Sequence, residues 1–323
     1  MAAMKSEFSR RTALLVGAGA FAAPALLTGV RPARAAAPML GTHSARFNRF
    51  KLGAFEVTTI LDNSRVVPDP GAIFGQNQSA EDFAALMAEN RLPADKSLFY
   101  FTPTLVNTGS ELVLFDTGLG GEDGLANQIA AAGYSADQVD VVVITHMHGD
   151  HIGGVMSGDA PTFPNARYVT GQVEYDFWLD EGHLSTDMAD RVKGVRAAIL
   201  PVAEKMTFLA DGGSVASGIT AIEAFGHTPG HMAYHIESEG QRLLIWGDTA
   251  NHFVASIQRP DWHVRFDMNK EDAAATRLKL FGMSSADMVP VIGYHMPFPA
   301  LGFIRETAGN WRWEPASYQL SFG

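Results

Sequence analysis

Apolar residues gather in short runs that predict strands, and these runs alternate with segments that predict helices. The clearest run is Val141-Val142-Val143-Ile144, whose β-branched residues are typical of a buried strand. Further runs predict strands over residues 51–61, 104–107, 111–115, 167–170, 219–225, 232–236, 242–246 and 288–292. Turns at Gly109 and Gly240 join two pairs of these segments into hairpins.

Helices are predicted where capping residues flank helix-forming segments. Ser79 is suited to cap a helix that continues to Glu89, and Gly282 is suited to stop a helix that begins at Asn269. Other helices are predicted over residues 123–132, 172–179 and 187–200. Residues 62–97 are otherwise irregular, and a stretch of this length usually has a function, so we expect it to wall the active site or form a dimer contact. The alternation of strand pairs and helices predicts an α/β sandwich in one domain.

Four predicted strands end in a residue that can bind a metal. These residues are His146, His227, Asp248 and His295. In α/β proteins, ligands bind beyond the carboxyl ends of the strands, so we expect these four side chains to converge at one edge.

The segment after the first of these strands is rich in potential ligands. His146, His148, Asp150 and His151 fall within six consecutive positions, and Gly153 and Gly154 follow them. Imidazole together with carboxylate is the ligand set of a zinc-type hydrolytic site. The alternative is a loop of four solvated polar residues, but such a cluster directly after an apolar strand favours a bound cation.

These motifs resemble those of the metallo-β-lactamase superfamily. The chain has H-x-H-x-D-H at residues 146–151, G-H-T-x-G-H at 226–231, G-D at 247–248 and a late histidine at 295. The resemblance covers nearly the whole chain after residue 37 and implies a four-layer αββα sandwich. It also implies two divalent cations, with zinc expected: one on His146, His148 and His227, the other on Asp150, His151 and His295, and Asp248 bridging the two. Asp116, in a D-T-G motif, is implied to orient the ligands.

The remaining histidines are assigned other roles. His227 is preferred to His231 as the ligand because it directly ends a strand, whereas His231 begins the next one. His231 nevertheless stays open as an alternative ligand. No ligand pattern surrounds the others, which are expected to be structural or solvated: His43, His183, His235, His252 and His263.

The implied chemistry is hydrolysis. Two cations about 3.5–4 Å apart can share a hydroxide at neutral pH, and this hydroxide attacks a carbonyl or phosphoryl centre. Asp150 can take up the proton of the hydroxide. Flavodiiron proteins have Glu at the position of His148, so redox chemistry is disfavoured. True β-lactamases lack the bridging carboxylate that Asp248 supplies, which disfavours antibiotic hydrolysis.

The substrate class rests on aromatic residues and on one departure. Many acyl-homoserine lactonases have Tyr at the position of Asn251, which could instead donate to a developing oxyanion or act as a turn residue. The segments 295–299 and 311–313 resemble the exported methyl parathion hydrolase branch and its lactonase or arylesterase relatives. Trp178, Phe177 and Phe298 are candidates to line an apolar pocket, with core packing as the alternative.

We therefore predict a dinuclear hydrolase of lactones or aryl esters, with promiscuous hydrolysis of organophosphate triesters as a further activity. One alternative is a hydroxyacyl-thioester hydrolase, although no basic cluster for glutathione carboxylates accompanies the ligands. A second alternative is an exported metal-binding protein without turnover. The expected partner is a small apolar ester or lactone, and a homodimer through residues 62–98 is implied by the resemblance alone.

Composition and the N-terminus narrow the setting. The chain has no cysteine, which excludes disulfides and thiolate metal sites. Arg10-Arg11, the apolar run over residues 13–30 and the alanines at 35–37 resemble a twin-arginine export signal over residues 1–37, with the mature domain at 38–323. We therefore expect a periplasmic or secreted protein with no stable membrane anchor after cleavage; an uncleaved anchor is the alternative. The formal charge of −11 becomes −15 without these residues, whose net charge is +4, and this disfavours nucleic acid as a partner.

Overall fold

The fold is described from a computed structural model that covers residues 45–121 and 124–317. The predicted export signal at residues 1–37 lies outside the described residues. None of the helices in the described part of the chain is both long and apolar enough to span a bilayer.

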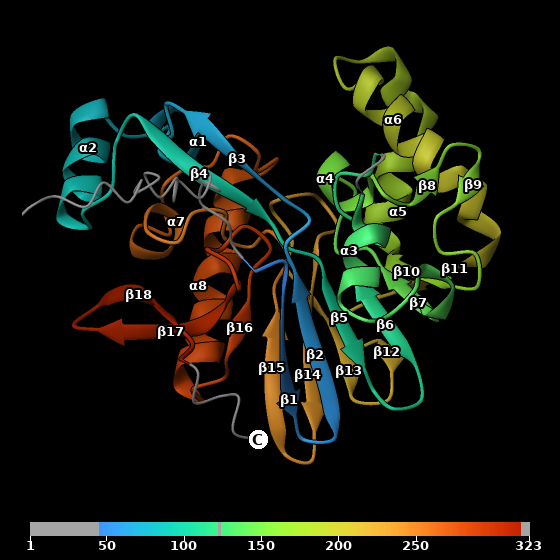
Figure 1. Ribbon diagram of the computed structural model, residues 1–323. Coiled ribbons are helices and arrows are strands. Elements are labelled where there is room, and N and C mark those ends of the chain that lie inside the picture. The colour runs from blue at the N-terminus through green and yellow to red at the C-terminus, as the bar shows by residue number, and fades with distance from the viewer. Residues whose placement is uncertain (1–44, 122–123, 318–323) are drawn as a thin grey trace, which may run out of the picture. The chain divides into compact units, whose positions relative to one another are not determined.

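Two seven-stranded sheets form the centre of the fold (Figure 1). The first sheet has the order β1-β2-β5-β6-β7-β10-β11, with bounds Phe47–Leu52, Phe55–Ile60, Thr104–Asn107, Leu112–Phe115, Val141–Val143, Arg167–Gly171 and Met206–Leu209. The second has the order β12-β13-β14-β15-β16-β17-β18, with bounds Ser214–Ala216, Ile219–Glu223, Met232–Ser238, Gln241–Ile245, Val291–Ile292, Leu301–Thr307 and Asn310–Pro315. In the first sheet β7 lies parallel to both β6 and β10, as expected for strands joined through helices.

The core forms two layers on either side of the first sheet, because β7 is apolar at every position. Val141 and Val143 pack between the sheets, against residues of the second sheet such as Ile219 and Ile236. Val142 points to the opposite face and packs with residues of α3 (Leu125–Ala131), α5 (Gln172–Leu179) and α6 (Ala189–Ile199). Strand side chains alternate between faces, so a run without polar residues is buried on both sides.

Helix α8 (Lys270–Ala286) covers the outer face of the second sheet (Figure 1), where its Leu280 and Phe281 join the same core as Trp246. Helices, two sheets and a helix therefore stack in four layers, which confirms the predicted αββα fold.

The chain between β2 and β5 was predicted to be mostly irregular, and this prediction was wrong. It holds a two-stranded ribbon, β3 (Asn63–Pro68) and β4 (Lys96–Phe101), with α1 (Gly71–Phe74) and α2 (Ala80–Glu89) between the strands. The α2 start was predicted correctly, since the Ser79 hydroxyl accepts from the Asp82 N–H. The ribbon escaped the pattern because its outer face carries exposed apolar residues, with Val66 67% exposed and its partner Leu98 46% exposed.

Other boundaries also differ from prediction. The strand predicted over residues 51–61 is the hairpin β1–β2, which turns at Gly53 with φ +58. Helix α8 continues through Gly282 because glycine in a helix costs only about 1 kcal/mol, and the buried Ser284 lies beyond it. The strand predicted at 288–292 is only Val291–Ile292, because Met288 has a positive φ of 50°, which lies outside the β region. The hairpin β17–β18 was not predicted.

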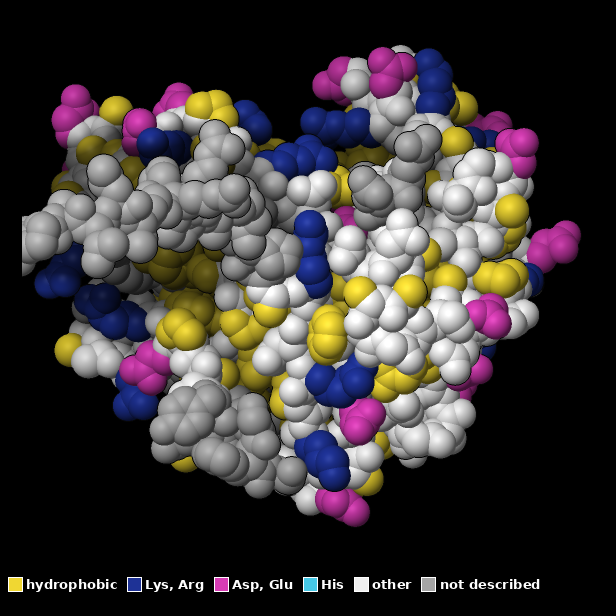
Figure 2. Space-filling model, in the orientation of Figure 1, with side chains coloured by type: hydrophobic (Ala, Val, Ile, Leu, Met, Phe, Trp, Pro, Cys, Tyr) yellow, Lys and Arg dark blue, Asp and Glu magenta, His cyan; other side chains and the backbone are white. Residues whose placement is uncertain are grey.

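Shorter elements complete the described part. The four-residue helices α4 (Gly149–Ile152) and α7 (Ala255–Gln258) lie in loops. Strands β8 (Met156–Ser157) and β9 (Ala160–Pro161) form a small hairpin, and 3-10 turns cover Ala136–Gln138, Glu181–Ser185 and Leu200–Lys205. In Figure 2 the surface is hollowed between the part that contains α1, α2, β3 and β4 and the part that contains α4, α5 and α6.

Candidate metal centre

Seven predicted ligands come together beyond the carboxyl ends of the strands. Their ligand atoms form three overlapping groups, each within 4.8 Å: His146, His148 and His227; His146, His151 and Asp248; and Asp150, His151 and His295. Helix α4 supplies Asp150 and His151, and the loop before it supplies His146 and His148. The other three ligands follow β13, β15 and β16.

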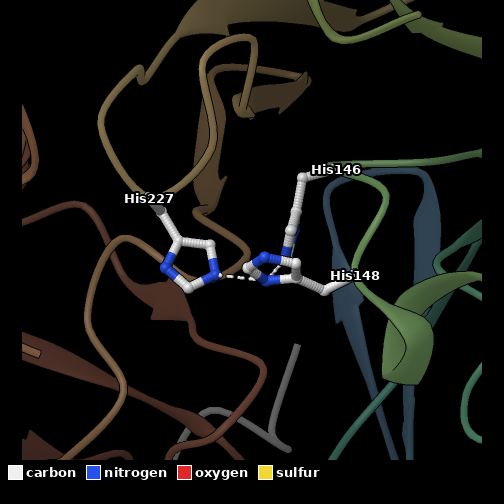
Figure 3. Close-up of side chains that lie close together, drawn as sticks. All are labelled: His146, His148 and His227. Carbon is white, nitrogen blue, oxygen red and sulfur yellow. Dashed lines mark hydrogen bonds between the residues drawn. The ribbon is translucent and has the colours of Figure 1, made fainter. Parts of the chain in front are cut away.

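The first group consists of three imidazoles with nitrogen atoms that face one another (Figure 3). Nε2 of His146 lies 3.1 Å from Nδ1 of His148, which lies 3.0 Å from Nε2 of His227. Nitrogen ligands about 2.05 Å from a tetrahedral zinc are separated by about 3.3 Å, so this spacing fits one cation.

The group of Asp150, His151 and His295, called the second ligand group from here on, lies around the carboxylates of Asp150 and Asp248. Nε2 of His295 lies 3.4 Å from Oδ2 of Asp150 and 3.1 Å from Oδ2 of Asp248. Nε2 of His151 lies 3.3 Å from Oδ1 of Asp248 and 3.6 Å from Oδ2 of Asp150. Oδ2 of Asp248 is also 3.3 Å from Nε2 of His227, so this carboxylate reaches both groups.

The second nitrogen of most ligand imidazoles is fixed by a neighbouring oxygen. Nδ1 of His227 donates to Asp267 (2.8 Å), Nδ1 of His151 to Asp116 (2.8 Å), and Nδ1 of His295 to the carbonyl of Tyr100 (2.6 Å). Nδ1 of His146 contacts the Thr145 hydroxyl (3.1 Å), which itself donates to Asp116. Such contacts leave the inward nitrogen free to bind a metal.

Two buried atoms of these seven side chains have no hydrogen-bond partner among the described residues: Nε2 of His151 and Oδ1 of Asp248. Unpaired buried polar atoms are costly, and these two lie 3.3 Å apart where a shared cation would satisfy both. The residues present therefore fit a pair of divalent cations.

Burial and neighbouring charges shift the pKa values of the imidazoles in different directions, lowering some and raising others. Burial and the nearby His227 lower the pKa of His148 to about 3, and burial also lowers that of His146 well below the ordinary range. For His227, burial is outweighed by hydrogen bonds with Asp248 and Asp267, which raise its pKa to about 9. For His295, burial is likewise outweighed by Asp248 and Asp150, which raise its pKa to about 8.

His231 lies beside the centre but its two ring nitrogens are occupied. Nδ1 contacts the carbonyl of Ala224 at 3.0 Å, and Nε2 accepts from the backbone N–H of Asp248 at 3.0 Å. His231 thus places the Asp248 backbone, and it belongs to none of the three groups. His252 is also engaged, since its Nδ1 accepts from the N–H groups of Val254 and Ala255 at the start of α7.

The predicted pocket residues lie in varied surroundings. Trp178 is 1% exposed, and its ring meets that of His148 edge to face at 6.0 Å. Phe177 is half-buried between Trp178 and His183, and Phe298 is half-buried as well. Asn251, for which an oxyanion donor and a turn residue were both left open, is buried and donates its amide to Oδ2 of Asp248 at 2.9 Å.

Three supporting residues were missed by the sequence analysis. Asp267 bonds His227 and also pairs with the buried Arg277. The Tyr294 hydroxyl donates to the Asp150 carbonyl at 2.5 Å. Glu174, in the first turn of α5, is fully buried and accepts hydrogen bonds from both ligand loops of the first group. These contacts join residues far apart in sequence; the only signal was a carboxylate in the first turn of a helix, which is normally a surface feature.

Comparisons with known proteins show the family to which the fold corresponds. The family model described as the metallo-beta-lactamase superfamily matches residues 102–291, which is more than half of the chain. The uncharacterized protein YobT of Bacillus subtilis (strain 168) is 30% identical over 153 residues, covering 47% of this chain and 63% of that protein. An N-acyl homoserine lactonase of Bacillus thuringiensis is 28% identical over 158 residues, covering 49% and 57%. The chain thus spans less than two thirds of the length of these two curated relatives.

A solved structure matches over a longer range. AidC, described as a dizinc quorum-quenching lactonase in complex with a product, superposes with a TM-score of 0.78 at 25% identity. The match covers 84% of this chain and 97% of AidC.

Proposed function

The chain belongs to the metallo-β-lactamase superfamily, and from this premise we propose that it is a dinuclear metallohydrolase of small apolar esters, with lactones as the first substrate class. The observation that carries the proposal is the pair of ligand groups joined by Asp248. His146, His148 and His227 would hold one cation, Asp150, His151 and His295 the other, and Asp248 would contact both. Zinc suits imidazole and carboxylate ligands.

Two bound cations would supply a nucleophilic water at neutral pH and polarise the ester carbonyl. The chain's own contribution centres on Asp150, the more exposed of the two carboxylates in the centre, with 23% of its side chain accessible against 4% for Asp248. Burial raises its pKa, but His151 and His295 outweigh burial and leave the pKa well below the ordinary range. Asp150 is therefore ionised at neutral pH.

Its carboxylate can accept a proton from the attacking water and return it to the leaving oxygen. The bond between the carbonyl carbon and that oxygen breaks, which gives a carboxylic acid and an alcohol. The Tyr294 hydroxyl fixes the Asp150 backbone through its carbonyl, so the carboxylate stays at the edge of the centre during this transfer.

The lactone class is supported by the comparisons, since both the Bacillus thuringiensis relative and AidC are described as lactonases. Aryl esters are the second class, supported by the half-buried Phe177, whose ring contacts that of the buried Trp178. Turnover of organophosphate triesters rests only on the resemblance of residues 295–299 and 311–313 to the methyl parathion hydrolase branch. Export through the N-terminal signal and a homodimer remain proposals from the sequence.

The test is a rate comparison on the purified protein loaded with zinc. An acyl lactone, an aryl ester and an aryl phosphotriester are assayed at matched concentrations, each before and after chelation. We expect chelator-sensitive turnover with the lactone favoured. Turnover of none of the three by protein that still binds two cations would overturn the ester proposal, and would move the choice to thioesters or to a non-catalytic metal-binding role.

A further inference from the structure

Glu174 lies between the two loops that carry the first ligand group, although it is not itself a ligand. It belongs to the first turn of α5, and its side chain is completely buried. An ionised carboxylate is costly to bury unless hydrogen bonds replace its water, so its contacts indicate why the fold keeps it there.

Four donors meet this carboxylate, two at each oxygen. Oε1 accepts from the backbone N–H of Met147 and from the indole N–H of Trp178, both at 2.8 Å. Oε2 accepts from the Thr228 hydroxyl at 2.7 Å and from the backbone N–H of Gly230 at 3.0 Å. All four partners are neutral, so the carboxylate serves as a hydrogen-bond acceptor and not as half of an ion pair.

The positions of these donors link Glu174 to three ligands. Met147 lies between His146 and His148, and Thr228 directly follows His227. Trp178 meets the ring of His148 edge to face. One carboxylate thus ties the loop that carries His146 and His148 to the loop that carries His227.

The loop of residues 226–231 packs closely against the start of α5. A Cβ on Gly230 would lie 2.1 Å from the backbone nitrogen of Glu174, so only glycine fits at this point. This close approach fixes the distance from α5 to the loop of residues 226–231, and the side chain of Glu174 then reaches the other loop.

We propose that Glu174 is a positioning residue for the first metal, holding the inward nitrogens of His146, His148 and His227 at the spacing that one cation requires. This inference rests on the proposed function in assuming that the centre binds metal. Within the described part of the chain, no hydrogen bond joins Glu174 to Asp150, His151 or His295, so its effect is expected on only one of the two cations.

Glu174→Gln tests this role with little change of volume. An amide keeps one acceptor oxygen and replaces the other with an NH₂ group, which would face a backbone N–H whichever way the side chain turns. The matched control is Asp176→Asn, the same change on the same helix, at an exposed carboxylate that contacts only Gln172 among the recorded bonds.

Zinc and cobalt(II) titrations followed by calorimetry and by cobalt absorption give the readout, with metal content per chain measured after dialysis. We expect Glu174→Gln to lower the affinity for one cation by about 10- to 100-fold and to leave the affinity for the other unchanged. Asp176→Asn is expected to bind both as the wild type does. Two cations bound by Glu174→Gln with wild-type affinity would overturn the inference, and so would equal weakening of both.

A second pair of variants covers the case in which Glu174→Gln does not fold. Thr228→Val removes one donor to Oε2 and should lower the affinity for the same cation by a smaller factor. Thr228→Ser keeps the hydroxyl and should bind this cation as the wild type does. Equal affinities for Thr228→Val and the wild type would contradict the role of Glu174. If the wild-type chain itself binds no metal, the proposed function fails, an outcome distinct from failure of this inference.

Discussion

Nδ1 of His227 donates to Oδ1 of Asp267 over 2.8 Å, and both side chains are buried. The other oxygen of Asp267 pairs with the guanidinium of Arg277, which comes from α8 and is itself buried. A proposed metal ligand is thereby connected to the helix that covers the second sheet. Because a carboxylate can only accept, this contact requires the proton on Nδ1 and leaves Nε2 free for a metal.

Asp267→Asn should lower both metal affinity and stability. The amide oxygen can still accept from His227, but Arg277 loses the charge that balances it and keeps only the carbonyls of Pro260 and Trp262. Removing one partner of a buried ion pair costs about 3 kcal/mol or more. Urea unfolding of the metal-free protein measures this cost.

The control for that variant is Asp287→Asn, which breaks the exposed pair between Arg242 and Asp287. Exposed pairs contribute about 0–1 kcal/mol, so little change is expected. Equal free energies of unfolding for the two variants would contradict the role assigned to the buried pair.

Phe99→Leu should weaken the second ligand group. The ring of Phe99 stacks on His295 with centroids 3.9 Å apart and planes 16° from parallel, and the next residue, Tyr100, accepts from the same imidazole. Strand β4 therefore fixes both the plane and the tautomer of His295. Loss of the stacked ring should reduce the affinity for one cation by about tenfold, measured by zinc titration.

Leu98→Ala supplies the comparison for Phe99→Leu, since Leu98 is the preceding residue on β4 and is 46% exposed. We expect Phe99→Tyr to retain wild-type affinity. The account of β4 is contradicted if Leu98→Ala and Phe99→Leu bind zinc equally well.

Metal affinity should rise with pH between about 7 and 9. In the metal-free protein the pKa of His295 is raised to about 8 and that of His227 to about 9. Both imidazoles are therefore in their charged form at neutral pH, with a proton on each ring nitrogen. A cation must displace these protons, and each proton released adds about one tenfold step in affinity per pH unit below its pKa. Zinc affinities at pH 6.5, 7.5 and 8.5 test this, and a flat profile would refute it.

The same two imidazoles should make the stability of the metal-free fold decrease as the pH rises. Their folded pKa values lie above the ordinary value of 6.5, so their contribution to stability is fully present below that pH. It is lost as the pH rises through about 8 and then about 9. The melting temperature of the chelated protein should therefore fall over this range, while added zinc should increasingly restore it.

His148→Ala should abolish turnover and leave the fold largely intact. The imidazole is central to the first group, within 3.1 Å of the nitrogens of His146 and His227, but it is only half-buried. Circular dichroism and the melting temperature of the metal-free protein should match the wild type. A wild-type rate in this variant would exclude the proposed role of the first group.

The sequence was sufficient to predict features that depend on local chemistry. The apolar residues of β7 indicated a strand buried on both faces, and Ser79 marked the start of α2. The superfamily motifs named the seven side chains that the fold brings together. In contrast, Gly282 misled because tertiary packing continues α8 beyond it, so the cost of glycine was overridden.

What could not be predicted depends on contacts between distant segments. Glu174 reaches Met147 and Thr228, and the residues paired with Asp267 lie 40 and 10 positions away. Nothing near Glu174 or Asp267 in the sequence distinguishes them from solvated carboxylates. The contacts that Phe99 and Tyr100 of β4 make with His295 likewise join segments that are distant in sequence.

The most direct test of the account is metal content measured together with turnover. The protein is stripped with a chelator, dialysed against zinc, and assayed on an acyl lactone as zinc per chain is determined. We predict two zinc ions per chain at saturation, no turnover without metal, and recovery of the rate as zinc is restored. Full turnover by the stripped protein, or saturation without a second bound zinc, would contradict the dinuclear centre.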